Sequence, residues 1–258
     1  MKIGFIGCGN MGSALISAVA ATGCAELIVA DNDSARAEAL AKRYGGHVGS
    51  NKVVAQAAEI LFLAVKPNVV WSVAREIRAS LRPDTLVVSM AAGIGLSTLD
   101  EMLGTAIIRI MPNTPVAVGE GMITWAKNAK VTENDERRFL SVMKCAGKLD
   151  EIPELMIDAA TAVAGCGPAF VYMFAEALAD GGVQCGLSRE KANAYAAQTL
   201  RGAALMLEKS GKHPGQLKDD VCSPGGSTIV GVHALEEGAV RASVAGAVIA
   251  AFEKTRGG

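Results

Sequence analysis

The chain opens with Lys2-Ile3-Gly4-Phe5-Ile6-Gly7-Cys8-Gly9-Asn10-Met11-Gly12, and this stretch decides the fold of the first part of the protein. The short apolar run over 3–6 is typical of a buried strand, and the Ala-rich segment 14–21 is typical of a helix. Between them the glycines have the Gly-x-Gly-x-x-Gly spacing, which lets the backbone turn sharply from strand to helix. Because the free N–H groups at the start of such a helix attract phosphates, the stretch predicts a dinucleotide site.

An acidic residue farther along the chain supports this interpretation of the glycines. Asp31 follows the apolar run Leu27-Ile28-Val29-Ala30, about 20 residues beyond the glycines, where dinucleotide-binding proteins carry a carboxylate. A carboxylate at this place suits the ribose 2′-OH of NADH and repels the 2′-phosphate of NADPH. Asn32, Ser34 and Arg36 would instead form a phosphate pocket if Asp31 pointed away. The sequence therefore predicts NADPH or NADH as cofactor without deciding between them.

Composition narrows the class of protein and its partners. Of the 258 residues 50% are hydrophobic and only 4% aromatic, and the net charge is −1. This balance gives no reason to expect nucleic acid or an anionic membrane surface as a partner. We find no secretory pattern and expect no apolar run of the roughly 18 residues that a membrane span needs, so we predict a cytoplasmic protein with reduced cysteines. No His, Cys or carboxylate cluster has metal-ligand spacing, and we expect no metal.

Alternating strand and helix patterns continue through the first part of the chain. The runs 27–30, 60–65, 86–90 and 106–111 are almost unbroken apolar segments of strand length, as in parallel sheets buried on both faces. This alternation predicts an α/β fold with a doubly wound, Rossmann-like sheet. Ligands bind such sheets outside the carboxyl ends of the strands, which places Ala64-Val65-Lys66-Pro67 beside the cofactor. For Asn113, at another strand end, a binding role and an ordinary turn role are equally compatible with the sequence.

The pattern changes near residue 150. Long Ala- and Leu-rich helical patterns cover 158–179, 188–209 and 239–252, so we predict an all-α second domain. The expected division is 1–152 for the dinucleotide-binding domain and 153–258 for the helical domain. Glycines weaken isolated helices by roughly 1 kcal/mol each, and close helix contact is the usual compensation. Since these helices carry so much Ala and Leu, we expect the second domain to bury surface against a second copy of itself.

One turn in the helical part has a composition suited to anions. Pro224-Gly225-Gly226 leads into a helix that we expect to start near Ser227-Thr228. Successive unpaired N–H groups at such a turn can hold a carboxylate. A plain loop with a helix cap is as compatible with the spacing.

Over essentially its whole length the chain resembles the pyrroline-5-carboxylate reductase family, which reduces a cyclic imine to L-proline with NADPH or NADH. In the first part the resemblance rests on 4–12, 64–67 and 111–115, and in the second on 165–170, 214–219 and 223–228. The last of these is the most specific. The resemblance implies a dinucleotide domain followed by a helical domain that intertwines in a dimer, which often assembles further.

The resemblance also implies site residues, position by position. Those implied to contact the cofactor are Ile6, Gly7, Cys8, Gly9, Asn10, Met11, Gly12, Asp31, Asn32, Asn51, Ala64, Val65, Lys66, Pro67 and Ala92. Those implied on the substrate side are Glu154, Gly225, Gly226, Ser227 and Thr228. The N–H groups of Gly225, Gly226 and Ser227 would anchor the substrate carboxylate, and the Thr228 hydroxyl would act beside the substrate nitrogen as the catalytic group. Cys166 stands where the family usually has Ser, and Asp31-Asn32 departs from the Asn-Arg of some members.

Three other interpretations compete with this one. A dehydrogenase of the 3-hydroxyacid or 6-phosphogluconate type commonly needs a Lys on the long helix as general acid or base, and 166–190 contains none. A deazaflavin-dependent NADP reductase shares the N-terminal domain but does not require the turn at 223–228. A catalytically silent dinucleotide-binding or redox-sensing protein would have a broken second site, whereas this turn is intact.

Overall fold

The computed structural model describes residues 1–255, which divide into two units. The first unit comprises Met1–Gly165 together with the chain from Phe252 onward, and the second comprises Cys166–Ala251. The predicted division between residues 152 and 153 stays a prediction.

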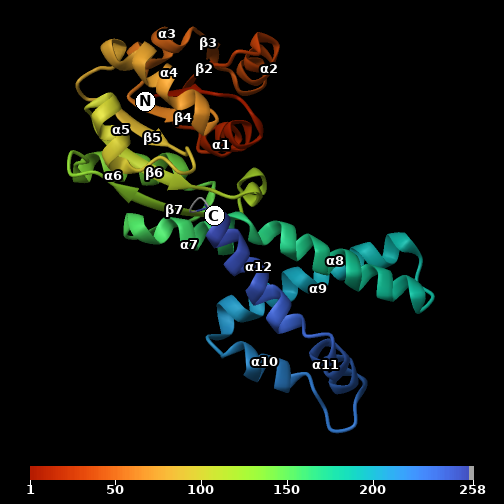
Figure 1. The fold of residues 1–258 in the computed structure, drawn as a ribbon. Coiled ribbons are helices and arrows are strands. Elements are labelled where there is room, and N and C mark those ends of the chain that lie inside the picture. Colours follow the sequence, from red (N-terminus) through yellow and green to blue (C-terminus); the bar gives the residue numbers. More distant parts are fainter. Residues whose placement is uncertain (256–258) are drawn as a thin grey trace. The chain divides into compact units, whose positions relative to one another are not determined.

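An eight-stranded sheet forms the centre of the first unit, with the strand order β3-β2-β1-β4-β5-β6-β7-β8 (Figure 1). The strands are β1 (Lys2–Ile6), β2 (Glu26–Ala30), β3 (His47–Val48), β4 (Ile60–Leu63), β5 (Leu86–Ser89), β6 (Ala106–Met111), β7 (Gly121–Lys127) and β8 (Gly147–Glu151). All neighbouring strands pair in parallel except β6 and β7. The order of β1 to β6 is that of a doubly wound Rossmann-like sheet, so the predicted fold class is confirmed.

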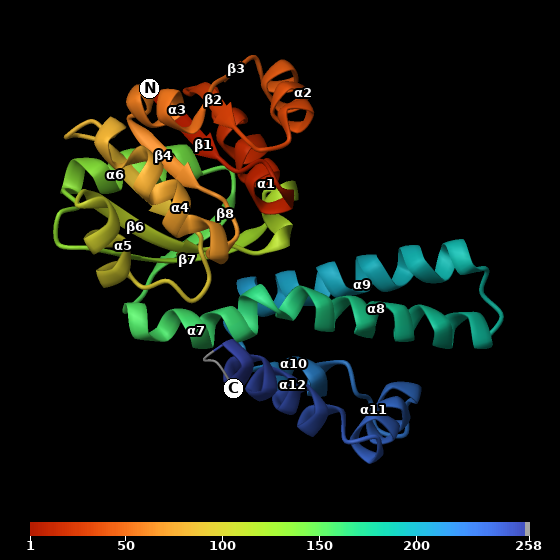
Figure 2. The same cartoon turned by 45° about the horizontal axis from the view of Figure 1, so that its top comes forward.

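Helices cover both faces of this sheet (Figure 2). One layer consists of α1 (Asn10–Ala20), α2 (Ser34–Tyr44) and α6 (Glu133–Met143), which pack against Ile3, Phe5 and Phe62. The other consists of α3 (Asn51–Ala57), α4 (Pro67–Ile77) and α5 (Leu96–Leu103), which pack against Ile6 and Leu63. Since successive residues of a strand face opposite sides, the unbroken apolar runs supply both cores at once.

The register of β1 with β2 and β4 places residues of the candidate cofactor site side by side at one edge of the sheet. Ile6 pairs with Ala30 of β2 and with Leu63 of β4. The residues that follow these three strand ends, Gly7, Asp31 and Ala64, therefore lie side by side. The rings of Phe5 and Phe62 stack one residue earlier, with centroids 4.5 Å apart, which fixes β1 against β4 below this edge.

Two strands and a bend go beyond what the sequence predicted. The strands β7 and β8 extend the sheet, although β8 (Gly147–Glu151) is mostly polar and carries no apolar run. The first long helix of the predicted helical part is not regular. It starts with a short helix η3 (Glu154–Met156) and α7 (Ile157–Ala160), and a π-helical turn η4 (Thr161–Gly165) interrupts it before α8. After Cys166, α8 begins with Gly167-Pro168, and proline cannot donate the hydrogen bond that a continuous helix needs.

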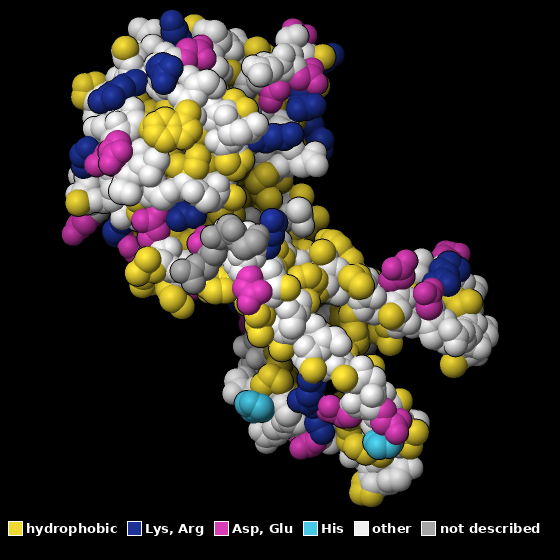
Figure 3. All heavy atoms as spheres, viewed as in Figure 1, with side chains coloured by type: hydrophobic (Ala, Val, Ile, Leu, Met, Phe, Trp, Pro, Cys, Tyr) yellow, Lys and Arg dark blue, Asp and Glu magenta, His cyan; other side chains and the backbone are white. Residues whose placement is uncertain are grey.

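The second unit is made of helices only. They are α8 (Gly167–Gln184), α9 (Arg189–Ser210), α10 (Pro214–Asp220), α11 (Ser227–Glu237) and α12 (Val240–Thr255), whose last residues count with the first unit. The buried core of this unit consists of Ala179, Ala192 and Ala196. Large side chains such as Met173 and Val230 stay exposed, and Figure 3 shows hydrophobic side chains gathered along α8 and α12.

One helical segment differs from our expectation about membrane spans. The continuous stretch Glu154–Gln184 has 31 residues and a mean hydropathy of 1.4 in its most apolar window, and 11% of that window is buried. By length and composition alone it could cross a membrane, so the expectation that no segment reaches this length was wrong. Among the described residues it is the single helix of this kind. A helix that buries its apolar face on a partner protein has the same composition.

Candidate cofactor and substrate site

The glycines of the opening stretch each meet a different steric need. Gly7 has φ +103°, and a Cβ there would lie 2.5 Å from the carbonyl oxygen of Ala64. A Cβ at Gly12 would lie 2.3 Å from the carbonyl oxygen of Gly7. No atom lies within 4 Å of the place where a Cβ of Gly9 would stand, so that side of the loop is open to a ligand. Gly9 caps α1 without a side-chain hydrogen bond, which leaves the first N–H groups of α1 available to phosphates.

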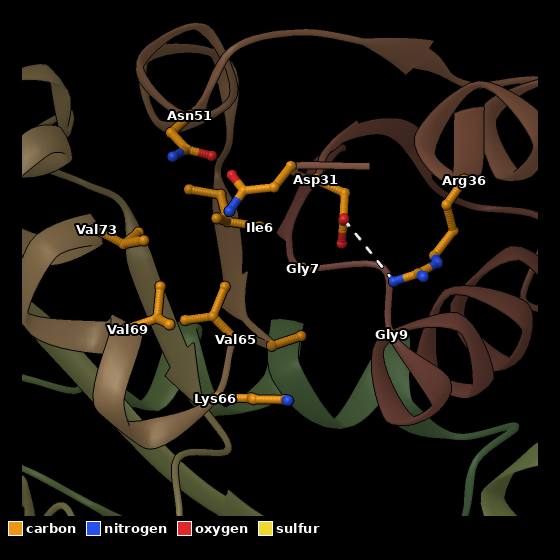
Figure 4. Close-up of a pocket in the computed structure, with 12 residues that line it drawn as sticks. Ile6, Gly7, Gly9, Asp31, Arg36, Asn51, Val65, Lys66, Val69 and Val73 are labelled. Carbon is orange, nitrogen blue, oxygen red and sulfur yellow. Dashed lines mark ion pairs between the residues drawn. The ribbon is translucent and has the colours of Figure 1, made fainter. Parts of the chain in front are cut away.

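A cavity of about 240 Å³ lies over this loop at the carboxyl edge of the sheet (Figure 4). Its lining is Ile6, Gly7, Gly9, Asp31, Asn32, Arg36, Asn51, Ala64, Val65, Lys66, Val69 and Val73. The cavity thus brings together nine of the predicted cofactor residues from four separate chain segments. Cys8, Asn10, Met11, Gly12, Pro67 and Ala92 do not line it. The assignment of all fifteen to cofactor contacts stays a prediction.

Three residues of the lining were missed as site residues by our sequence analysis or left as an alternative. Val69 and Val73 stand four residues apart on α4, so they present one apolar face to the cavity. Helical spacing after Lys66-Pro67 was the available signal. Arg36, which the sequence offered only as part of an alternative phosphate pocket, extends its guanidinium toward the cavity from α2 (Figure 4).

The carboxylate of Asp31 is already held by the protein. One oxygen accepts a hydrogen bond from the Cys8 N–H, and the other accepts one from the Asp33 N–H at 2.8 Å. Arg36 Nη1 lies 3.9 Å from Asp31, and Arg36 Nη2 lies 3.2 Å from Asp33. Asp31 therefore ties the end of β2 to the glycine loop. The half-exposed guanidinium of Arg36 and the ammonium of Lys66 are the two cationic groups among the residues that line the cavity.

Cys8 is a packing residue rather than a nucleophile. Its side chain is fully buried beneath the loop. Burial, and after it the nearby Asp31 carboxylate, raises the pKa of the Cys8 thiol to about 11, from an ordinary 9.0. The thiol is therefore protonated at neutral pH and is a poor target for oxidants, which weakens the redox-sensor interpretation at this position.

Glu154 and Asn113 both lie in the first unit, at the carboxyl edge beyond β5 and β6. A carboxylate oxygen of Glu154 accepts from the Leu96 N–H at 2.6 Å and from Arg109 Nη1 at 3.1 Å. The buried Asn113 side chain accepts from the Met122 N–H and donates to the Ala164 carbonyl, both at 2.9 Å. Both ends of the Asn113 amide thus serve the fold, which favours the structural role for this residue.

The predicted substrate turn lies in the second unit. Gly225 has φ +69°, and Gly226 caps α11 without a side-chain hydrogen bond. The helix begins at Ser227, as predicted. Gly226 donates its N–H to the Ser223 carbonyl at 3.0 Å to close the turn. The resemblance implied that this N–H anchors the substrate carboxylate, but in the structure it is already used. Within the described chain, the backbone N–H groups of Gly225, Ser227 and Thr228 meet no protein acceptor and remain for a carboxylate.

Among residues 1–255, no group of three or more His, Cys, Asp or Glu side chains is arranged to hold a metal ion.

Comparison with known proteins identifies relatives for both parts of the chain. Residues 154–257 match the family described as pyrroline-5-carboxylate reductase dimerisation, and residues 2–93 match NADP oxidoreductase coenzyme F420-dependent. The pyrroline-5-carboxylate reductase of Escherichia coli (strain K12) is 44% identical over 98% of this chain and 97% of its own. That of Arabidopsis thaliana is 41% identical over 99% and 94%.

Solved structures identify the same family and also include proteins that share only the fold. The Plasmodium falciparum pyrroline carboxylate reductase with NADP bound superposes with a TM-score of 0.89 at 36% identity, over 99% of this chain and 97% of its own. The Mycobacterium tuberculosis 3-hydroxyisobutyrate dehydrogenase reaches 0.53 at 19% identity, over 82% and 72%. The second likeness shows a shared fold alone.

Proposed function

The chain belongs to the pyrroline-5-carboxylate reductase family, and from this premise we propose which of its residues perform the reaction. The enzyme reduces L-1-pyrroline-5-carboxylate to L-proline, the last step of proline biosynthesis, with NADPH or NADH as reductant. The observation that carries the assignment is 44% identity to the E. coli reductase along 98% of this chain.

The cavity of the first unit fits a dinucleotide. The side of the loop at Gly9 is open, and a Cβ there would meet no atom within 4 Å. The uncapped start of α1 offers N–H groups to a pyrophosphate, and Val65, Val69 and Val73 supply an apolar wall. When bound, the reduced nicotinamide supplies the hydride. The residues of this chain bind it and hold it at the carboxyl edge of the sheet.

We propose that the enzyme prefers NADPH. Both oxygens of Asp31 accept backbone N–H groups, from Cys8 and Asp33, so this carboxylate is committed to the loop. Arg36 supplies a cation beside it, and a guanidinium matches a phosphate well. The alternative is that the Asp31 carboxylate binds the ribose, as one interpretation of the sequence has it.

The turn in the second unit is proposed to bind the substrate. The N–H groups of Gly225 and Ser227 hold the substrate carboxylate, helped by the positive end of α11. The Thr228 hydroxyl accepts a hydrogen bond from the protonated ring nitrogen. A C=N bond accepts hydride more readily when its nitrogen is protonated, so the substrate needs positioning more than it needs a strong acid. Such alignment removes roughly 7–11 kcal/mol of barrier in favourable cases.

Self-association follows from the second unit. The chain carries a dimerisation domain over 154–257, and its helices leave Met173, Met206 and Val230 exposed. We propose that a second copy of the chain covers these side chains, in a dimer or a higher homo-oligomer. The apolar segment Glu154–Gln184 then faces protein instead of lipid. All six cysteines are free thiols, which supports a reducing compartment such as the cytoplasm.

The decisive experiment monitors the oxidation of NADPH and of NADH with three substrates in parallel. These are L-1-pyrroline-5-carboxylate, a 2-keto acid and no added substrate. We expect turnover with the imine only, faster with NADPH. Turnover with the keto acid alone would assign the chain to the hydroxyacid dehydrogenases. Cofactor binding without turnover of either would restore the silent-binder interpretation.

A further inference from the structure

A buried arginine lies at the carboxyl edge of the sheet, outside the cofactor cavity. Arg109 on β6 is 5% exposed. Its Nη1 is 3.1 Å from Glu154 and its Nη2 is 3.6 Å from Asp158, whereas its Nε has no partner in the described chain. A buried cation is costly unless it is paired and hydrogen-bonded. The two carboxylates therefore fix the guanidinium, and the guanidinium fixes them.

Glu154 uses the same oxygen to reach a second element. Its Oε1 accepts the Leu96 N–H at 2.6 Å, from a residue 58 positions away. Leu96 is the first residue of α5, whose N-cap Gly95 offers no side chain. Glu154 therefore caps α5 from a distant part of the chain, with its negative charge at the positive end of the helix.

The capped helix start is one end of a loop that contains a predicted cofactor contact, Ala92. The segment 90–95 runs from β5 to α5, and the Met90 N–H bonds to the carbonyl of Leu63 at 3.3 Å. Leu63 precedes Ala64 and Val65 of the cofactor cavity. The loop therefore leaves the sheet beside the cavity wall, and its exposed middle contains Ala92, a predicted cofactor contact. Ala91 is buried in the core and Ile94 packs against it, and the cap holds the end of the loop at Leu96.

We propose that Arg109 and Glu154 form a long-range cap that holds the loop 90–95 in the conformation that receives the cofactor. Glu154 is then a positioning residue that acts through Leu96, and it does not touch the substrate. This inference refines the substrate-side role that the resemblance implied for Glu154, and it rests on the proposed function only for the identity of the cofactor.

The test begins with the cofactor-free enzyme and four variants. Glu154→Ala removes the acceptor, Glu154→Gln keeps a neutral acceptor oxygen, and Arg109→Met removes the cation. Asp158→Asn is the matched control, because Asp158 contacts Arg109 but not the loop. Loss of Arg109 leaves two carboxylates that are each about one third exposed, with 33% and 34% of their side chains accessible. Water can solvate them, so we expect this variant to fold.

The first readout is hydrogen exchange of the Leu96 amide. A hydrogen bond to a charged acceptor corresponds to roughly tenfold or more in an opening equilibrium. We expect exchange at least about tenfold faster in Glu154→Ala, with Glu154→Gln and Arg109→Met between it and the wild type. Asp158→Asn should stay within about twofold of the wild type. Unchanged exchange in Glu154→Ala would overturn the proposal.

The second readout separates positioning from substrate contact. The Kd for NADPH is measured by titration without imine, and the KM for the imine is measured at saturating NADPH. The proposal predicts an NADPH Kd raised about 3- to 10-fold in Glu154→Ala, partly restored in Glu154→Gln, with little change in the imine KM. A raised imine KM with an unchanged NADPH Kd would make Glu154 a substrate ligand instead. Exchange and Kd need no imine turnover, so failure of the assigned reaction would be seen separately.

Discussion

The two units of the molecule handle apolar surface in opposite ways. The first unit encloses its large side chains, and Phe5, Phe62 and Phe139 are all fully buried. In the second, helices of 18 and 22 residues bury three alanines between them. Three alanines remove little apolar surface from water. Because burial stabilises a fold by roughly 25 cal/mol per Å² of apolar surface, this small core contributes little to the stability of the second unit. The sheet unit therefore has a core of its own, whereas we propose that the helical unit completes its core against a second copy of the chain.

The largest expected effect comes from charging the exposed face of the second unit. Met173→Asp combined with Met206→Asp places two carboxylates where we propose that a second copy packs. Burying each unpaired charge would cost several kcal/mol, so light scattering should find the 26.5 kDa monomer in place of an oligomer, with activity lost. The matched control is Trp71→Glu on α4, an apolar residue of the first unit that is 54% exposed, compared with 70% for Met173 and 56% for Met206. If both variants stay oligomeric, the contrast between the units does not concern assembly.

The next effect tests whether the turn of the second unit is catalytic or only a helix start. Thr228→Ala should keep the fold and lower kcat/KM for the imine by a factor on the order of 10–100, because one hydrogen bond to the ring nitrogen is lost. Thr228→Ser keeps the hydroxyl and should recover most of the activity. Equal kinetics for the alanine variant and the wild type would remove Thr228 from the mechanism.

A smaller effect concerns cofactor choice in the first unit. Arg36→Gln removes the cation proposed to meet the 2′-phosphate, so kcat/KM with NADPH should fall by roughly 10-fold, while kcat/KM with NADH changes little. Arg43→Gln is the control, since Arg43 lies over the Tyr44 ring, 5.2 Å from its centroid, outside the cavity. A parallel loss with both cofactors would show that Arg36 supports the loop instead of selecting the phosphate.

The smallest effect is a pH dependence that belongs to the buried core of the first unit. The pKa of the Cys8 thiol is raised in the folded protein to about 11 from 9.0, so the protonated thiol stabilises the fold. This contribution is fully present below pH 9 and is lost as the pH rises toward 11. Cys8→Ala should therefore lose less stability than the wild type over this range, measured as the shift in Tm. Identical pH profiles would contradict this account of Cys8.

Much of the first unit could be predicted from local sequence. The unbroken apolar runs gave strands of the doubly wound sheet, because a parallel strand covered on both faces has no polar side. The glycine spacing gave the turn, because Gly7 needs a positive φ that side chains resist. By contrast β8 carries Lys148, Asp150 and Glu151 and was missed, since an edge strand need not be apolar.

The sequence by itself determined the fold class, the turn that receives a dinucleotide and the likeness to a reductase family. Each of these depends on residue types and spacings that act over a few positions. Only the tertiary structure decided what Asp31, Gly226 and Glu154 do with their polar groups. Their partners are the Cys8 N–H, the Ser223 carbonyl, and Leu96 with Arg109. For Asp31 and Glu154 the partners come from distant segments, so strand register and helix placement, which no local pattern encodes, bring the donors and acceptors together.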